Sequence, residues 1–413
     1  MSRSSLIIFR GLSIVYKIFY ILQPVEILKK VLKVLSVSSA VIKNQTTFYP
    51  KFVLDFENSF AEYIGCKYGL SFCNGTSSIE AALFALNIGP GDEVLVPSAT
   101  FHASINPILN AGATPVYIDI DKETVTISPS DLRRKITTNS KSIMVVHLWG
   151  NVAEMDEIIQ IAKDHGLSII EDASHAHGAE WDGEKVGSLG DIGCFSLQGS
   201  KPISAGEGGM AVTNSENLFY RMSMYGHFGR HGTEINYQDN NISKTGLGTK
   251  RRANPLGIAA ANIDLRYNDY YNRKKNKNWR RLGNTINKML GLQMSEKSAQ
   301  VLMGGYFGGI PLRVNNKKAS VRTIIKLLNQ CGIAAHAYPY PMHHQMGHMI
   351  DVDYRNILFN VKATENIEFD SVSLPVTETL PSKLLFLDSR FLVFLPFWMK
   401  WVLAKVLKRS TTV

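Results

Sequence analysis

Residues 142–174, SIMVVHLWGNVAEMDEIIQIAKDHGLSIIEDAS, decide the fold class of this chain. The stretch opens with a run that is apolar in its middle, which is typical of a strand buried on both faces. A segment with apolar residues at helical spacing follows and ends at Gly166, and a second apolar run ends in Glu171 and Asp172. A strand, a helix and a second strand in this order predict a parallel pair joined by a crossover helix.

The same alternation extends on both sides of this stretch. Residues 68–86, YGLSFCNGTSSIEAALFAL, predict a short strand, a turn at Asn74-Gly75 and a helix capped by Thr76 or Ser77. Other strands are expected at 93–97, 114–120, 191–200 and 208–214, and another helix at 52–64. The pattern predicts an α/β fold with a large, mainly parallel sheet, in which ligands bind at the carboxyl ends of the strands.

The pattern changes beyond about residue 265. A basic helix, the glycine patch GGYFGG, a strand at IPLRV and a helix at 319–331 predict a smaller α+β domain. We therefore expect three parts in this chain of 413 residues. They are an apolar, basic N-terminal extension at 1–44, a large domain at 45–265, and a small C-terminal domain with a basic amphipathic tail at 266–413.

Composition is that of a folded, basic, intracellular protein. Hydrophobic residues make up 45% and charged residues 19%, which excludes a disordered chain. The net charge of +10 favours anionic partners, although the basic runs at 250–252 and 273–277 are equally typical of solvated helix faces. The four cysteines form no CxxC pair and no metal-ligand spacing, so they indicate buried thiols in a reducing compartment, such as the cytoplasm, and no metal site.

Both ends of the chain are apolar and basic. Residues 6–22, LIIFRGLSIVYKIFYIL, are short and charged for a spanning helix and lack the cleavage site of a signal peptide. Residues 391–408 combine aromatic and aliphatic side chains with lysines. Such segments suit peripheral contact with the inner face of the membrane. The alternative is that they pack on the protein or on a second subunit.

One lysine has neighbours that suit covalent chemistry. Lys201 lies in FSLQGSKPISAGEGG, where glycines permit close backbone approach and Ser196 offers a hydroxyl to a phosphate oxygen. A lysine that is desolvated in a pocket loses proton affinity and becomes a nucleophilic amine. Such an amine can form a Schiff base with an aldehyde cofactor, although most single lysines in loops are simply solvated.

Other candidate residues stand at predicted strand ends. Asp172 could pair with the protonated pyridine nitrogen of pyridoxal phosphate (PLP), or Glu171-Asp172 could cap the next helix. His175 follows closely enough to bind another ring substituent. The amides and hydroxyls of Asn74-Gly75-Thr76-Ser77-Ser78 suit a phosphate at a helix N-terminus. Phe101, in PSATFHAS, could stack on an aromatic ring or belong to the core.

These motifs together resemble the DegT/StrS family. NGTSS, GDEVLVPSATFHASINPILNAGATPVYIDID, EDASHAHGA and FSLQGSKPISAGEGG occur in the order and spacing of that family, which comprises fold-type-I PLP enzymes acting on sugars. The resemblance is strong over 45–265 and weaker to about 390. It implies the fold-type-I architecture of a large parallel-sheet domain and a smaller C-terminal α+β domain, and a homodimer with its active sites at the interface.

The resemblance also implies roles for single residues. Lys201 is similar to the Schiff-base lysine, Asp172 to the partner of the pyridine nitrogen, and His175 to the neighbour of the ring hydroxyl. Gly75, Thr76 and Ser196 resemble phosphate ligands, and Phe101 the aromatic residue that stacks on the cofactor. Lys250 stands where the family often has the Asn that reaches the phosphate of the adjacent subunit's cofactor.

The function that the resemblance implies is a transamination. Glutamate, or glutamine, would donate its amino group, and a keto sugar linked to a nucleotide would accept it, with no nucleic acid involved. One rival is a PLP-dependent sugar dehydratase of the same family, in which His replaces the Schiff-base lysine, so Lys201 argues against it. The other rival is a non-catalytic, membrane-associated scaffold that kept the fold.

Overall fold

The structure is a computed structural model. It describes residues 23–46, 49–227, 230, 247, 249–290, 292–293, 301–304, 306, 310–314, 320–330, 334–346 and 372–387. The two terminal segments that were expected to contact a membrane, 6–22 and 391–408, lie outside the described residues. Within the described part, no helix is both long and apolar enough to cross a bilayer.

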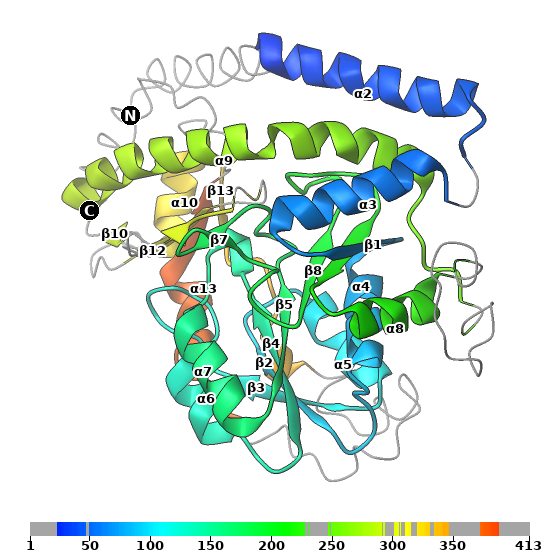
Figure 1. Cartoon of the computed structure of the whole chain (residues 1–413). Coiled ribbons are helices and arrows are strands. Elements are labelled where there is room, and N and C mark those ends of the chain that lie inside the picture. Colours follow the sequence, from blue (N-terminus) through cyan, green and yellow to red (C-terminus); the bar gives the residue numbers. More distant parts are fainter. Residues whose placement is uncertain are drawn as a thin grey trace.

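A seven-stranded, mainly parallel sheet forms the centre of the molecule (Figure 1). Its order is β1-β9-β8-β5-β4-β2-β3. The bounds are β1 Tyr68–Phe72, β2 Glu93–Pro97, β3 Thr114–Ile118, β4 Ser140–Val146, β5 Ser168–Asp172, β8 Ile192–Ser196 and β9 Gly209–Thr213. The strands from β3 to β8 are parallel, and β9 pairs antiparallel with β8 and β1. The predicted α/β class and mainly parallel sheet are confirmed.

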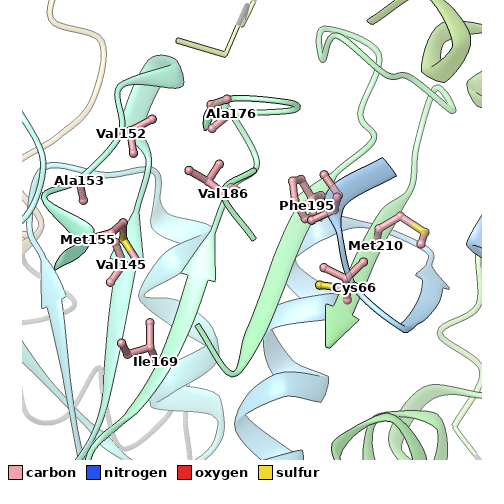
Figure 2. Close-up of a cluster of buried hydrophobic side chains, with 14 of the residues drawn as sticks. Cys66, Val145, Val152, Ala153, Met155, Ile169, Ala176, Val186, Phe195 and Met210 are labelled. Atoms are coloured by element: carbon pink, nitrogen blue, oxygen red, sulfur yellow. The ribbon is translucent and has the colours of Figure 1, made fainter. Parts of the chain in front are cut away.

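Alternate residues of the central strands enter two hydrophobic cores, one on each face of the sheet. In β4, Ile143 and Val145 face one core, whereas Met144 and Val146 face the other. Successive side chains of a strand point to opposite faces, and both faces are covered here, so residues 143–146 of β4 are all apolar. Figure 2 shows part of the first core, in which Val145 and Ile169 lie near Met155.

Helices cover each face of the sheet. The first core contains side chains of α3 (Lys51–Ile64), α6 (Pro129–Lys135) and α7 (Met155–His165). The second contains side chains of α4 (Gly75–Ala85), α5 (Asn106–Asn110) and α8 (Glu216–Gly226). The amphipathic helix predicted to end at Gly166 is α7, and Gly166 ends it in the left-handed conformation that glycine adopts without penalty.

A long helix, α9 (Pro255–Leu290), leads out of this domain into smaller sheets. The four-stranded antiparallel sheet has the order β10-β12-β14-β13, with bounds β10 Leu292–Gln293, β12 Ile310–Val314, β13 Ala335–Ala337 and β14 Leu384–Leu387. The helices α10 (Val321–Gln330) and α13 (Leu380–Lys383) also belong to the C-terminal part, and β11 (Val301–Leu302) pairs with β6 (Glu180–Trp181), which pairs with β7 (Glu184–Lys185). The expected boundary at 265 falls inside α9, and the three-part division stays a prediction.

The first described helix, α2 (Pro24–Ile42), lies along α9 (Figure 1). Lys29 and Lys33 form ion pairs with Asp264 at 2.9 and 2.5 Å. Further along, Ser36 Oγ donates a hydrogen bond to the carbonyl oxygen of Ala259. Residue numbers rise along α2 as they fall along α9, so the two helices run antiparallel.

Candidate active site

A cavity of about 310 Å³ opens at the carboxyl ends of the parallel strands. Segments that follow β2, β5 and β8 line it, together with the start of α4 and two tyrosines from the C-terminal part. Its polar and aromatic lining comprises Asn74, Gly75, Thr76, Thr100, Phe101, Ser104, Asp172, Ser174, His175, Ser196, Gln198, Ser200, Lys201, Glu207, Tyr306 and Tyr340. Seven of the eight residues proposed from the sequence therefore lie in one cavity, and Lys250 does not line it.

Lys201 presents an amine with weakened proton affinity. Its burial lowers the pKa to about 8, and the negative charge of Asp172 opposes this effect. The Nζ atom lies 4.2 Å from the centroid of the Tyr306 ring. A lysine held in this way is more often neutral at physiological pH than a solvated lysine, which makes it a better nucleophile and base.

Asp172 ends β5 and is 5% exposed. Its Oδ2 accepts a hydrogen bond from Ser104 Oγ at 2.6 Å, and its Oδ1 accepts one from the backbone amide of Ser174 at 3.1 Å. The Ser104 hydroxyl is itself 2.8 Å from Thr100 Oγ1. Two neutral donors hold the carboxylate in place but leave acceptor capacity for a cation in the cavity.

The alternative that Glu171 and Asp172 cap a following helix does not fit the structure. Successive side chains of β5 point in opposite directions, so Glu171 turns away from the cavity. It accepts hydrogen bonds from the amides of Gly187, Leu189 and Gly190 and lies 3.0 Å from His147 Nε2. Glu171 therefore fixes the loop behind the site, and Asp172 faces the cavity.

His175 is a neutral donor beside the same cavity. Burial, and then the positive charge of Lys201, lower its pKa well below the usual value of 6.5. Its Nδ1 accepts a hydrogen bond from the backbone amide of Trp149 at 3.2 Å, so the proton of the neutral ring is assigned to Nε2. The ring also stacks on Tyr306, with centroids 4.0 Å apart. The predicted contact with a ring substituent thus has a defined donor, Nε2–H.

The start of α4 suits a phosphate group. The helix begins at Gly75, and its N-cap is Asn74, whose side chain accepts from the amide of Ser77 at 2.8 Å. The expected cap at Thr76 or Ser77 was wrong, because both residues already lie inside the first turn of the helix that Asn74 caps. A Cβ on Gly75 would lie 2.9 Å from Cβ of Ser196, so only glycine lets α4 approach the end of β8 this closely.

Phe101 lines the cavity and is exposed, whereas Lys250 does not line it. Phe101 follows β2, lines the cavity and is 45% exposed, so it is not a core residue. Its ring lies 6.0 Å from that of Tyr340 in an edge-on arrangement. Lys250 is exposed and forms a β-bridge with His227. Its expected contact with another subunit's cofactor stays a prediction.

Four residues of the site were not found from the sequence. Ser104 was visible in the PSATFHAS motif, three residues after Phe101. Tyr306 and Tyr340 come from the C-terminal part of the chain, and no local sequence pattern reveals that this part reaches the strand ends. Trp149 has the left-handed φ of 57°, which is rare for a bulky residue, and no composition signal marks it.

A model of the DegT/DnrJ/EryC1/StrS aminotransferase family matches residues 32–384. The chain belongs to this family. Its relatives include the GDP-perosamine synthase of Caulobacter vibrioides, 46% identical over 174 residues, which are 42% of this chain and 47% of that protein. Another is the dTDP-3-amino-3,6-dideoxy-alpha-D-galactopyranose transaminase of Aneurinibacillus thermoaerophilus, 41% identical over 222 residues, or 54% of this chain and 59% of that protein. The matches thus span about half the length of these curated relatives.

Solved structures match over almost the whole chain. An aminotransferase from Psychrobacter cryohalolentis is 27% identical, with a TM-score of 0.78 and coverage of 92% of this chain and 96% of that one. DesV of S. venezuelae, solved in complex with a ketimine intermediate, is 25% identical, with a TM-score of 0.75 and coverage of 93% and 95%. These neighbours confirm the fold-type-I architecture.

Enzymes of this family depend on PLP, and the residues present fit that cofactor. Gly75 and Thr76 offer backbone amides in the first turn of α4, and Ser196 offers a hydroxyl beside them, which together suit the phosphate. Asp172 suits the pyridine nitrogen, His175 the ring hydroxyl, and Lys201 the aldehyde carbon. Phe101 lines the same cavity, and its contact with a ring face stays a prediction.

Proposed function

We propose that this protein transfers an amino group from glutamate or glutamine to a keto sugar linked to a nucleotide. The observation that carries the proposal is the enclosure of Lys201, with its lowered pKa, in one cavity with Asp172 and the start of α4. Bound PLP would act as the electron sink that stabilises negative charge on the carbon that loses a proton.

The side chains divide the remaining work. Lys201 Nζ, once free of the cofactor, takes and returns the proton as general base and acid, because a pKa near 8 lies close to working pH. The Asp172 carboxylate would keep the pyridine nitrogen protonated, and Ser104 keeps that carboxylate oriented. His175 would offer Nε2–H to the ring hydroxyl, because its Nδ1 already accepts a hydrogen bond from the backbone amide of Trp149.

The substrate class rests on the relatives and on charge. The two curated relatives described above are named for GDP- and dTDP-linked amino sugars. A net charge of +10 favours a substrate that carries a diphosphate. We therefore propose a nucleotide-linked keto sugar as the acceptor and amino-sugar or glycan biosynthesis as the setting.

A direct test offers GDP- and dTDP-linked keto sugars to the PLP-loaded protein with glutamate or glutamine that carries an isotopically labelled amino nitrogen. Mass spectrometry should find the label in the sugar. Loss of the sugar hydroxyl without gain of label would indicate the dehydratase. A protein that neither binds PLP nor turns over any sugar would indicate the scaffold, and either result would overturn the proposal.

We also propose that two copies form a homodimer with shared active sites. Lys250 is exposed, lies outside the cavity of its own subunit, and belongs to the motif that the family resemblance assigns to the neighbouring site. Mixing a Lys201→Ala chain with a Lys250→Ala chain tests this arrangement. Hybrid dimers should regain activity in one site if Lys250 acts across the interface, whereas a monomer in light scattering would refute it.

A further inference from the structure

Helix α2 is amphipathic with its polar side turned inward. The side that faces α9 carries Glu26, Lys29, Lys33 and Ser36, which bond with Tyr271, Asp264 and Ala259. The helices of globular proteins ordinarily turn their apolar side toward the core. In α2 the ion pairs and hydrogen bonds occupy the inner side, so the apolar side chains are left on the outer surface.

That outer surface is an apolar ridge, broken by the exposed Ser38. It consists of Ile27, Leu28, Val31, Val34, Leu35, Val41 and Ile42, which are 44% to 83% exposed. Seven of the ten large hydrophobic residues found exposed in the described part of the chain thus lie on this one helix. Ile27, Val34 and Val41 are seven residues apart, as are Leu28, Leu35 and Ile42, so they share one face over the length of the helix.

The charges around the ridge have one sign. Lys30 and Lys43 are exposed on α2 and just after it, whereas its acidic residue, Glu26, is buried. On the neighbouring α9, Arg273 and Lys277 are exposed beyond the point where Tyr271 meets Glu26. An apolar ridge flanked by cations has the composition of a helix that lies in the interface of an anionic bilayer.

We infer that the α2 ridge docks this protein on the surface of an anionic membrane, with the helix lying parallel to the bilayer. This inference goes beyond the proposed transamination and does not rest on it. In the sequence, residues 6–22 directly before the ridge repeat the combination of apolar and basic residues. A second copy is a poorer occupant because it would bring Lys30 and Lys43 of two basic chains together.

The test uses full-length, PLP-loaded protein and flotation with vesicles of phosphatidylcholine alone or with a quarter of phosphatidylglycerol. The wild-type protein should float with the anionic vesicles and far less with the neutral ones. The double variant Val34→Glu/Leu35→Glu should lower the partition coefficient at least about tenfold, because two side chains that enter the bilayer become charged. The matched control, Val34→Ile/Leu35→Met, keeps the ridge apolar and should float like wild type.

Two further measurements keep the outcome decisive. Circular dichroism and the visible absorbance of the bound cofactor should be the same in all three proteins, because both substituted side chains are exposed. Light scattering reports their oligomeric state. The inference is overturned if wild-type protein stays at the bottom of the gradient, if the glutamate variant floats equally well, or if that variant dissociates a dimer, which would make the ridge a subunit interface.

Discussion

The lowered pKa of Lys201 predicts how fast the protein captures its cofactor at each pH. Only the neutral amine attacks the aldehyde. With a pKa of about 8 in place of 10.5, about 10% of the amine is neutral at pH 7 instead of about 0.03%, a gain of about 300-fold. Because the shift is downward, the neutral fraction is already large in the physiological range and saturates above the lowered pKa.

The assay mixes cofactor-free protein with PLP between pH 6 and 10, stops the reaction with borohydride, and quantifies the labelled Lys201 peptide. The rate of covalent attachment should rise about tenfold per pH unit and level off near pH 8. Nα-acetyl-lysine treated in parallel reports the titration of PLP itself and of an exposed amine. Asp172→Asn should move the midpoint down, since the negative charge of Asp172 raises the pKa of Lys201.

Two results would refute this reasoning. A midpoint near that of Nα-acetyl-lysine would mean that the site does not desolvate the amine. Label on another lysine, or undiminished label in Lys201→Ala, would mean that Lys201 is not the residue that holds the cofactor.

Three substitutions test the rest of the site. Asp172→Asn should keep the fold, as measured by circular dichroism, and lower kcat at least about 100-fold, roughly 3 kcal/mol. The reason is that a neutral amide cannot stabilise the protonated ring. Near-normal turnover would exclude Asp172 from the mechanism. Ser104→Ala should lower kcat about tenfold and shift the pH titration of the cofactor's absorbance, because Asp172 loses a hydrogen-bond donor. Ser104→Thr, which keeps the hydroxyl, should restore both. A loss of activity with an unchanged titration would indicate that Ser104 has only a structural role. Gly75→Ala should weaken PLP binding about tenfold or more in a fluorescence titration, because the added Cβ would lie 2.9 Å from Cβ of Ser196. The control Gly199→Ala should bind PLP normally, because the nearest atom to its added Cβ would be 3.7 Å away.

The large domain could be predicted because its signals are local. The strands β4 and β5 are buried on both faces, and their apolar runs, 143–146 and 169–170, end abruptly at polar residues. Gly166 ends α7 by its own backbone preference. Parallel strands place their carboxyl ends at one edge, so Asp172 and Ser196 were expected together before any geometry was known.

The remainder depends on contacts between distant segments. Tyr306 and Tyr340 reach the cavity from the C-terminal part, and no spacing in the sequence reports that docking. From the sequence, Asn74 could lie in a turn or act as the N-cap of the following helix, and the structure shows that it is the N-cap of α4. The sequence of α2 is amphipathic, but its periodicity could not tell which side faces the protein, because that depends on Asp264 of α9.

Helix α9 should tolerate few insertions or deletions of residues, because it makes contacts at two places along its length. Asn268 and Asn272 both donate side-chain hydrogen bonds to the carbonyl oxygen of His177, two residues after His175, which lines the candidate site. Asp264 and Ala259 of the same helix contact α2. Deleting or inserting one residue between Ala259 and Asn272 would turn one end of the helix by about 100° against the other and break one set of contacts or the other. We therefore expect in-frame insertions and deletions among relatives to avoid this segment.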